Sequence, residues 1–180
     1  MLSEFKPALR FLFVFLALYL VGNLVYGLWI EMYNPRPDPM TRIVTNQTGW
    51  VINHLGYSVD RVDNANGPTV YLKSNLQMIL NIYEGCNGIN VLIVFVAFVI
   101  AFKGPVKKML AFLLFGVVVI HLTNIVRLVL LYWVAIGYQR YFYYVHKYFF
   151  TAAIYAVVFL LWLLWIKLVH GKPSEIKQAA

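Results

Sequence analysis

The chain has 180 residues, of which 62% are apolar and only 12% are charged, and its formal net charge is +8. A typical soluble domain is about half apolar and carries about 25% charged residues, so this composition excludes an ordinary soluble protein and indicates a membrane protein. The positive charge does not indicate nucleic-acid binding, because lysine and arginine gather on the cytoplasmic side of membrane proteins and the signatures of nucleic-acid-binding modules are missing.

Residues 11–30 form an apolar run without any charged residue, and Lys6 and Arg10 precede it. A membrane span needs about 20 apolar residues, whereas the apolar region of a cleaved signal peptide has about 7–15 and ends in small residues. Because this run is longer and ends in large residues, we expect an uncleaved first transmembrane helix at about residues 9–30.

A polar segment, residues 31–85, follows this first helix. Three prolines oppose helix formation at its start. Apolar residues then recur at roughly helical spacing as far as Leu55, which predicts a short amphipathic helix on the membrane surface. Residues 57–62 and 69–73 resemble strands, and the turn-forming residues between them favour a β-hairpin.

The rest of the chain contains three further apolar runs. The first predicts a helix at about residues 86–102, which the basic loop 103–108 ends. The second, residues 109–138, would be about 45 Å long as one helix, whereas the hydrocarbon core is about 30 Å thick. It therefore tilts, protrudes or breaks, with residues 123–124 as the weak point. The last predicted span is at about residues 150–168, after an aromatic segment.

The predicted fold class is an all-α polytopic membrane protein, with residues 1–180 in a single membrane domain. We expect about four transmembrane helices, one of them a candidate for a break, and a small extracytoplasmic loop insert. If the N-terminus is cytoplasmic, lysine and arginine exceed acidic residues in the cytoplasmic segments, whereas the charges of the long loop are balanced. The positive-inside rule therefore favours cytoplasmic N- and C-termini.

In this orientation three reactive side chains reach the outer boundary of the membrane. Cys86 lies at the outer end of the second helix, and His146 lies just before the fourth. Arg127 lies about 27 Å along the third helix, near its outer end. Hydropathy does not require these residues to share one depth, so together they form a candidate catalytic site.

Cysteine, histidine and arginine together suit acyl transfer on a peptide. The thiolate is the attacking form of cysteine, and a histidine within reach can take up the thiol proton and later protonate a leaving amine. Arginine stays charged, so it can stabilise an oxyanion or lower the pKa of the thiol.

The residues around this trio add support. The chain has one cysteine, which therefore forms no intramolecular disulfide, and Glu84 and Gly88 belong to the polar, glycine-rich segment that surrounds it. Asn124 precedes Arg127 by three residues and is a candidate to hold its side chain. Each catalytic candidate also has an ordinary explanation: burial for the cysteine, snorkelling to the headgroups for the arginine and an interfacial position for the histidine.

The other histidines are weaker candidates. His54 is a rival base on the outer loop but belongs to the predicted amphipathic helix, His121 suits a hydrogen bond between helices, and His170 lies on the cytoplasmic side. The sequence has no phosphate-binding loop and no spacing typical of metal ligands, so we expect no cofactor and no metal.

At these residues the chain resembles the exosortase/archaeosortase family. The resemblance rests on Glu84-Gly85-Cys86-Asn87-Gly88, on Asn124-Ile125-Val126-Arg127 and on His146 in its aromatic segment. It implies a membrane-embedded cysteine protease/transpeptidase at the periplasmic face of the bacterial inner membrane. Its substrates would be exported proteins that end in a short motif, a transmembrane helix and a basic cluster. Cys86 would be the nucleophile, His146 the base and acid, and Arg127 the transition-state stabiliser.

Larger members of that family have about twice as many spans. This chain most resembles the short exosortase F type of Bacteroidetes, which implies a dedicated companion membrane protein. The expected partners are thus exported proteins, membrane lipids and that companion, without nucleic acid.

Two other functions stay open at this point: a non-catalytic envelope assembly or scaffold protein, and a transporter subunit with a polar path through Arg127 and His121.

Overall fold

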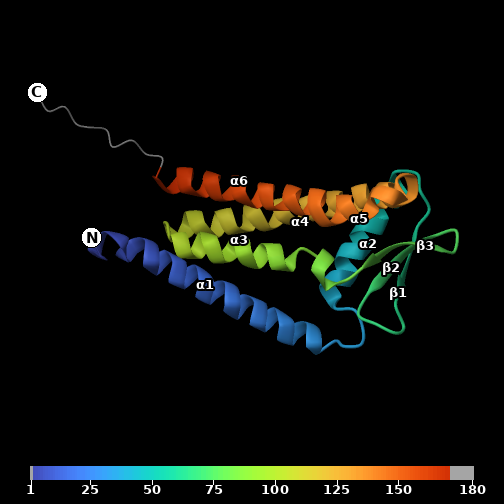
Figure 1. Cartoon of the computed structure of the whole chain (residues 1–180), viewed down its shortest axis with the longest axis horizontal. Coiled ribbons are helices and arrows are strands. Elements are labelled where there is room, and N and C mark those ends of the chain that lie inside the picture. Colours follow the sequence, from blue (N-terminus) through green and yellow to red (C-terminus); the bar gives the residue numbers. More distant parts are fainter. Residues whose placement is uncertain (1, 171–180) are drawn as a thin grey trace, which may run out of the picture.

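The computed structural model describes residues 2–170 and confirms a mostly helical, polytopic membrane fold with a small sheet insert (Figure 1). Its elements in chain order are α1 (Leu2–Glu31), α2 (Pro39–His54), β1 (Asp60–Asp63), β2 (Val70–Ser74), β3 (Gln77–Ile82), the 3₁₀ turn η1 (Glu84–Cys86), α3 (Ile89–Phe102), α4 (Val106–Gly137), the 3₁₀ turn η2 (Gln139–Tyr141), α5 (Phe142–Tyr144), the π-helical turn η3 (Val145–Phe149) and α6 (Phe150–His170).

Among the described residues, three helical segments are long and apolar enough to cross a membrane: Phe5–Glu31, Val106–Gly137 and Gln139–Val169. Helix α3 is apolar but shorter. Helices α3, α4 and α6 pack against one another, and α1 contacts α3 but diverges from the bundle toward the sheet (Figure 1). The bundle core is built from large apolar side chains, including the fully buried Phe95 and Trp165.

Helix α3 begins later than the sequence predicts. Its first residue is Ile89 rather than Cys86, because Gly88 adopts the left-handed conformation with φ of +86° and interrupts the helical backbone. Cys86 instead ends the turn η1. Alone, α3 is about 21 Å long, so it falls short of the about 30 Å hydrocarbon core.

Helix α4 is continuous, so the expected weak point at residues 123–124 does not break it. The polar groups there are satisfied in other ways: Thr123 Oγ1 donates to the Val119 carbonyl oxygen at 2.8 Å, and the buried Asn124 side chain bonds across to the η1 turn. At about 48 Å the helix is longer than the hydrocarbon core, so it tilts or extends beyond it.

The predicted amphipathic helix is present as α2. Asp38 caps it, with its Oδ1 accepting a hydrogen bond from the Thr41 backbone N–H at 3.0 Å. The prediction that α2 rests on the membrane surface is incomplete, because Val44 and Ile52 are buried in a core shared with α4 and the sheet. Only part of its apolar surface, including Trp50, is exposed.

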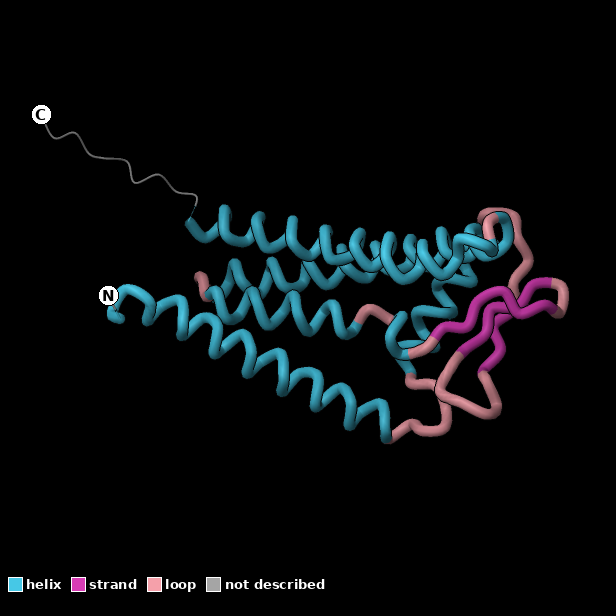
Figure 2. Tube along the Cα trace, in the orientation of Figure 1, coloured by secondary structure: helices cyan, strands magenta, loops and turns pink. Residues whose placement is uncertain are grey.

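The predicted β-hairpin is part of a three-stranded antiparallel sheet with the order β1-β2-β3 (Figure 2). Strand β3 was not predicted from the sequence. It follows β2 after a tight turn at Asn75 and Leu76, both of which have positive φ. Such turns usually have the sequence Asn-Gly, and because leucine takes the place of glycine here, the sequence does not indicate the turn. Leu80 and Ile82 of β3 are buried against α4.

Close packing of α3 on α4 depends on Gly116, because a Cβ atom at this position would overlap the ring of the buried Phe95. We expect Gly116→Ala to destabilise the fold by about 1–3 kcal/mol, as overpacked cores do. Gly27→Ala is the matched control, since a Cβ at Gly27 meets nothing within 4 Å. Thermal unfolding in detergent micelles measures both, and equal midpoints for the two variants would contradict this packing.

Candidate active site

Cys86 lies in the turn η1, between strand β3 and helix α3. The side chain is buried, and the Cys86 backbone N–H donates to the Tyr83 carbonyl oxygen at 2.8 Å. The Asn124 side chain of α4 donates from Nδ2 to the Cys86 carbonyl oxygen at 2.8 Å. The cysteine backbone is therefore held by the residue that precedes its own turn and by Asn124 of α4, 38 residues away in the sequence.

His146 stands next to the thiol. Its Nε2 is 3.9 Å from Cys86 Sγ, and the two residues are 60 positions apart in the sequence. The histidine lies in the π-helical turn η3 at the start of the last span, where its ring stacks on Phe142 with a centroid distance of 5.9 Å. A separation somewhat longer than an ideal hydrogen bond is usual for catalytic pairs without substrate, and π-helical turns are frequent at functional sites.

Arg127 is held by Asn124, the residue that also binds the cysteine turn. One terminal nitrogen of its guanidinium donates to Asn124 Oδ1 at 3.2 Å, as the three-residue spacing predicted. Its Nε is buried and has no hydrogen-bond partner among the described residues. Arg127 is not among the residues that line the cavity shared by Cys86 and His146. Its charge nevertheless acts on the thiol.

Burial raises the pKa of the Cys86 thiol, and it outweighs the positive charge of Arg127 and the backbone hydrogen bond to Tyr83, which both lower that pKa. The negative charge of Glu84 adds to the increase. Burial therefore favours the neutral thiol over the thiolate. The adjacent imidazole must then take up the proton during attack.

Glu84 and Gly88 have different roles around Cys86. The carbonyl oxygen of Glu84 accepts a hydrogen bond from Tyr26 Oη at 3.4 Å. The Glu84 Oε2 atom is buried, and no described residue forms a hydrogen bond with it. Its carboxylate disfavours the thiolate, so Glu84 does not activate the nucleophile. Gly88 lets the turn approach α4, since a Cβ there would lie 3.3 Å from Asn124 Cγ in addition to requiring a positive φ.

Asn87 is a site residue for which the sequence offers no signal beyond its place next to the cysteine. Its buried Nδ2 donates to Tyr26 Oη at 2.7 Å and to Thr41 Oγ1 at 3.2 Å. Its Oδ1 accepts from the Ile89 N–H at 3.0 Å, at the first turn of α3. Asn87 thus connects the cysteine turn with α1, α2 and α3 at once.

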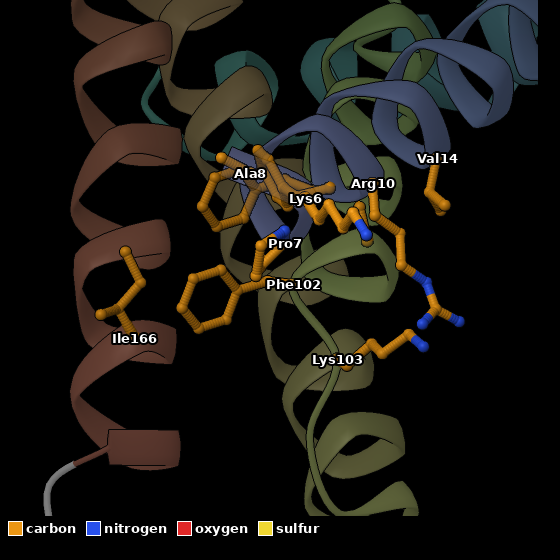
Figure 3. Close-up of a pocket in the computed structure, with 11 residues that line it drawn as sticks. Lys6, Pro7, Ala8, Arg10, Val14, Phe102, Lys103 and Ile166 are labelled. Carbon is orange, nitrogen blue, oxygen red and sulfur yellow. The ribbon is translucent and has the colours of Figure 1, made fainter. Parts of the chain in front are cut away.

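Cys86 and His146 both open into a cavity of about 280 Å³. A larger cavity, of about 780 Å³, lies at the other end of the bundle between α1, α3 and α6 (Figure 3). Among the described residues that line it are Lys6, Arg10 and Lys103, and none is a cysteine, serine, threonine, histidine or carboxylate. The smaller cavity is therefore the candidate active site.

The other histidines do not join this site. His121 Nε2 is 2.8 Å from Gln47 Oε1, so it links α4 to α2, and His54 Nδ1 is 2.8 Å from the Trp50 carbonyl oxygen within α2. The side chain of His170 lies outside the described residues. Among those described, no group of three or more histidine, cysteine, aspartate or glutamate side chains is arranged to hold a metal ion.

Comparison with known proteins gives one family match. A family model described as transmembrane exosortase matches residues 5–166, which is most of the chain. No curated protein and no solved structure shows significant similarity to this chain. The matched range includes every residue of the candidate site.

The charges around Cys86 predict how fast the thiol is alkylated as pH changes. Because burial raises its pKa, we expect the rate with iodoacetamide to keep rising beyond the ordinary thiol value of about 8.5. Arg127→Gln removes a charge that favours the thiolate, so its rate curve should move to still higher pH. The rates are measured on purified protein in detergent, where the single cysteine makes labelling specific.

Arg36→Gln is the control for this measurement, because Arg36 is exposed in the loop after α1 and does not contribute to the pKa of Cys86. Its curve should coincide with that of the unmodified protein. An Arg127→Gln curve at lower pH would show that the guanidinium does not favour the thiolate.

Proposed function

We propose that this chain, which belongs to the transmembrane exosortase family, is a cysteine transpeptidase or peptidase whose nucleophile is Cys86. The family match supports a membrane transpeptidase role in general. The observation that carries the specific proposal is the 3.9 Å separation of Cys86 Sγ and His146 Nε2 at a shared cavity. A thiol and an imidazole at this distance form the pair that acyl transfer through a thioester requires.

In the proposed reaction, His146 Nε2 takes the proton of the Cys86 thiol as Sγ attacks the carbonyl carbon of the scissile peptide bond. The tetrahedral intermediate collapses when the C–N bond breaks, and the imidazolium returns the proton to the leaving amine. This leaves a thioester on Cys86. An acceptor amine or water then attacks the thioester, His146 takes up its proton, and cleavage of the C–S bond restores the thiol.

Arg127 acts in this scheme mainly through charge. Its guanidinium lowers the pKa of the thiol and stabilises the negative charge that moves from sulfur to the carbonyl oxygen during attack. Its hydrogen bond to Asn124 fixes the same side chain that holds the Cys86 carbonyl, so it also positions the nucleophile. Direct contact with the oxyanion, which the family resemblance implies, requires the guanidinium to reach the cavity in the substrate complex.

We further propose that the substrates are exported proteins with a C-terminal motif, a transmembrane helix and a basic cluster. The site then faces the periplasm of a bacterial inner membrane, and both termini are cytoplasmic. The basic residues at the opposite end of the bundle, Lys6, Arg10 and Lys103, support this orientation through the positive-inside rule. The short exosortase F subtype and its companion membrane protein belong to the same proposal.

The test is processing of such an exported protein from the same genome in cells that carry the unmodified chain or Cys86→Ala at equal abundance. We expect the variant to leave the substrate uncut, because no other cysteine is present to replace the nucleophile. Leu130→Ala, on an exposed apolar position of α4, is the matched control and should process normally. Unchanged processing by Cys86→Ala would instead favour a scaffold role.

A covalent intermediate gives a second prediction. Substrate incubated with purified protein should form an adduct that neutral hydroxylamine releases, as expected for a thioester. His146→Gln should slow its formation by about 10²–10⁴-fold, the usual contribution of a general acid–base. Adduct formation at the unmodified rate in His146→Gln would show that another group deprotonates the thiol.

A further inference from the structure

Strand β3 is an edge strand of the sheet. It pairs with β2 on one side and has no strand on the other. Within the described part of the chain, no backbone group of Gln77–Ile82 forms a hydrogen bond outside the pairing with β2. The outward N–H and C=O groups of this strand therefore lack protein partners, although such groups are almost always paired when buried.

The free edge borders the cavity that contains the thiol. All residues from 78 to 83 line that cavity, opposite Leu128 and Leu131 of α4 and Phe142 of α5. Successive side chains of a strand point to opposite faces of the sheet, so a cavity lined by consecutive residues meets the strand at its backbone edge. The cavity thus gives access to the unpaired backbone groups rather than to one face of the sheet.

A second cavity continues along the same strand, away from Cys86. Its volume is about 510 Å³, and Gln77, Met78 and Ile79 line it together with residues of α4, η2 and α5. The two cavities share Met78, Ile79 and Phe142. Together they follow the whole of β3, which is about 20 Å long at about 3.3 Å per residue.

We propose that β3 binds the substrate by strand addition, with an extended segment of the polypeptide next to the scissile bond as a fourth strand of the sheet. The inference rests on the proposed function, which requires a peptide bond to reach Cys86 Sγ. An extended peptide supplies the backbone donors and acceptors that the edge of β3 lacks, and strand addition is a common mode of peptide recognition. Cys86 lies in the turn η1, four residues after the last residue of β3, and lines the same cavity as the strand.

The opposite edge of the sheet is built differently. Strand β1 has four residues, three of them charged, and its Asp63 forms ion pairs with Arg42 at 3.1 Å and with Arg61 at 3.2 Å. Short, charged edge strands resist the addition of another strand. Strand β3 has six residues without a charge, so only its edge is suited to pair with a peptide.

The two cavities also give the bound segment an expected side-chain preference. Near the thiol, the lining is mostly apolar, from Leu128, Leu131 and Phe142. At the far end, Gln139 and Arg140 make it polar and basic. We therefore expect apolar side chains close to the scissile bond and a polar or acidic side chain farther along the segment.

Backbone hydrogen exchange tests the proposal without depending on cleavage. The protein is Cys86→Ala in detergent, and the probe is the exported protein used in the processing assay, at saturating concentration. We expect the amides of residues 77–82 that point away from β2 to exchange at least about tenfold more slowly with the probe bound, because these amides gain hydrogen bonds. The amides of residues 60–63, in β1, serve as the internal control and should not change.

Combined with hydrogen exchange, the processing assay distinguishes a failure of strand addition from a failure of the proposed catalytic function. If the unmodified protein cleaves the probe but residues 77–82 exchange as before, strand addition is wrong while the transpeptidase proposal stands. If the probe protects these residues but is never cleaved, strand addition holds and the catalytic proposal fails. If the probe is neither protected nor cleaved, both the strand-addition proposal and the catalytic proposal are wrong.

Ester substitution in the substrate gives a second, independent measurement. Replacing single backbone amides with esters removes one N–H donor at a time along the segment. Because neighbouring residues of a strand point their backbone donors to opposite edges, we expect kcat/KM to fall by about tenfold at alternate positions only. A uniform response along the segment would overturn strand addition.

Discussion

The side chain of Asn124 connects the parts of this molecule on which the candidate chemistry depends. It donates to the carbonyl oxygen of Cys86 and accepts from Arg127, and it is buried against Gly88. A carboxamide can do both at once, since it carries two N–H donors and a carbonyl acceptor. Without it, the cysteine turn would have no polar attachment to α4, and the arginine would lose its hydrogen-bond partner.

The surroundings of Cys86 have opposing effects on the pKa of its thiol. Burial and the carboxylate of Glu84 disfavour the thiolate, whereas Arg127 favours it. Within the part of the chain that the structure describes, Glu84 Oε2 and Arg127 Nε are buried without hydrogen-bond partners, and unpaired buried polar atoms cost free energy.

The sheet constrains where this site lies relative to the membrane. An open strand edge is not tolerated in contact with lipid, because no water is available there to pair with its backbone groups. A position of the insert formed by α2 and β1–β3 outside the hydrocarbon region, as the proposed orientation has it, leaves this edge accessible to water or to a peptide. The cysteine turn joins that insert to the apolar helix α3, so the thiol lies at the boundary between the two.

The sequence determined the properties that follow from local composition. Long apolar runs predicted the membrane fold and its main helices, and the glycine-rich cysteine segment with the later arginine and histidine led to the exosortase family, which the family match confirms. The three-residue spacing also predicted the bond between Asn124 and Arg127. Whether the chain belongs to the short F type stays a prediction.

Tertiary structure decided the features that depend on contacts between distant residues. The start of α3 at Ile89 depends on the left-handed Gly88, which is packed against Asn124, and the contacts of Asn87 reach residues 46 and 61 positions away. Strand β3 is recognised by its pairing with β2, since its own sequence resembles any short apolar run. Hydropathy could place Cys86 and His146 at one depth, but only packing of the helices could set their separation, because depth leaves their positions around the bundle undetermined.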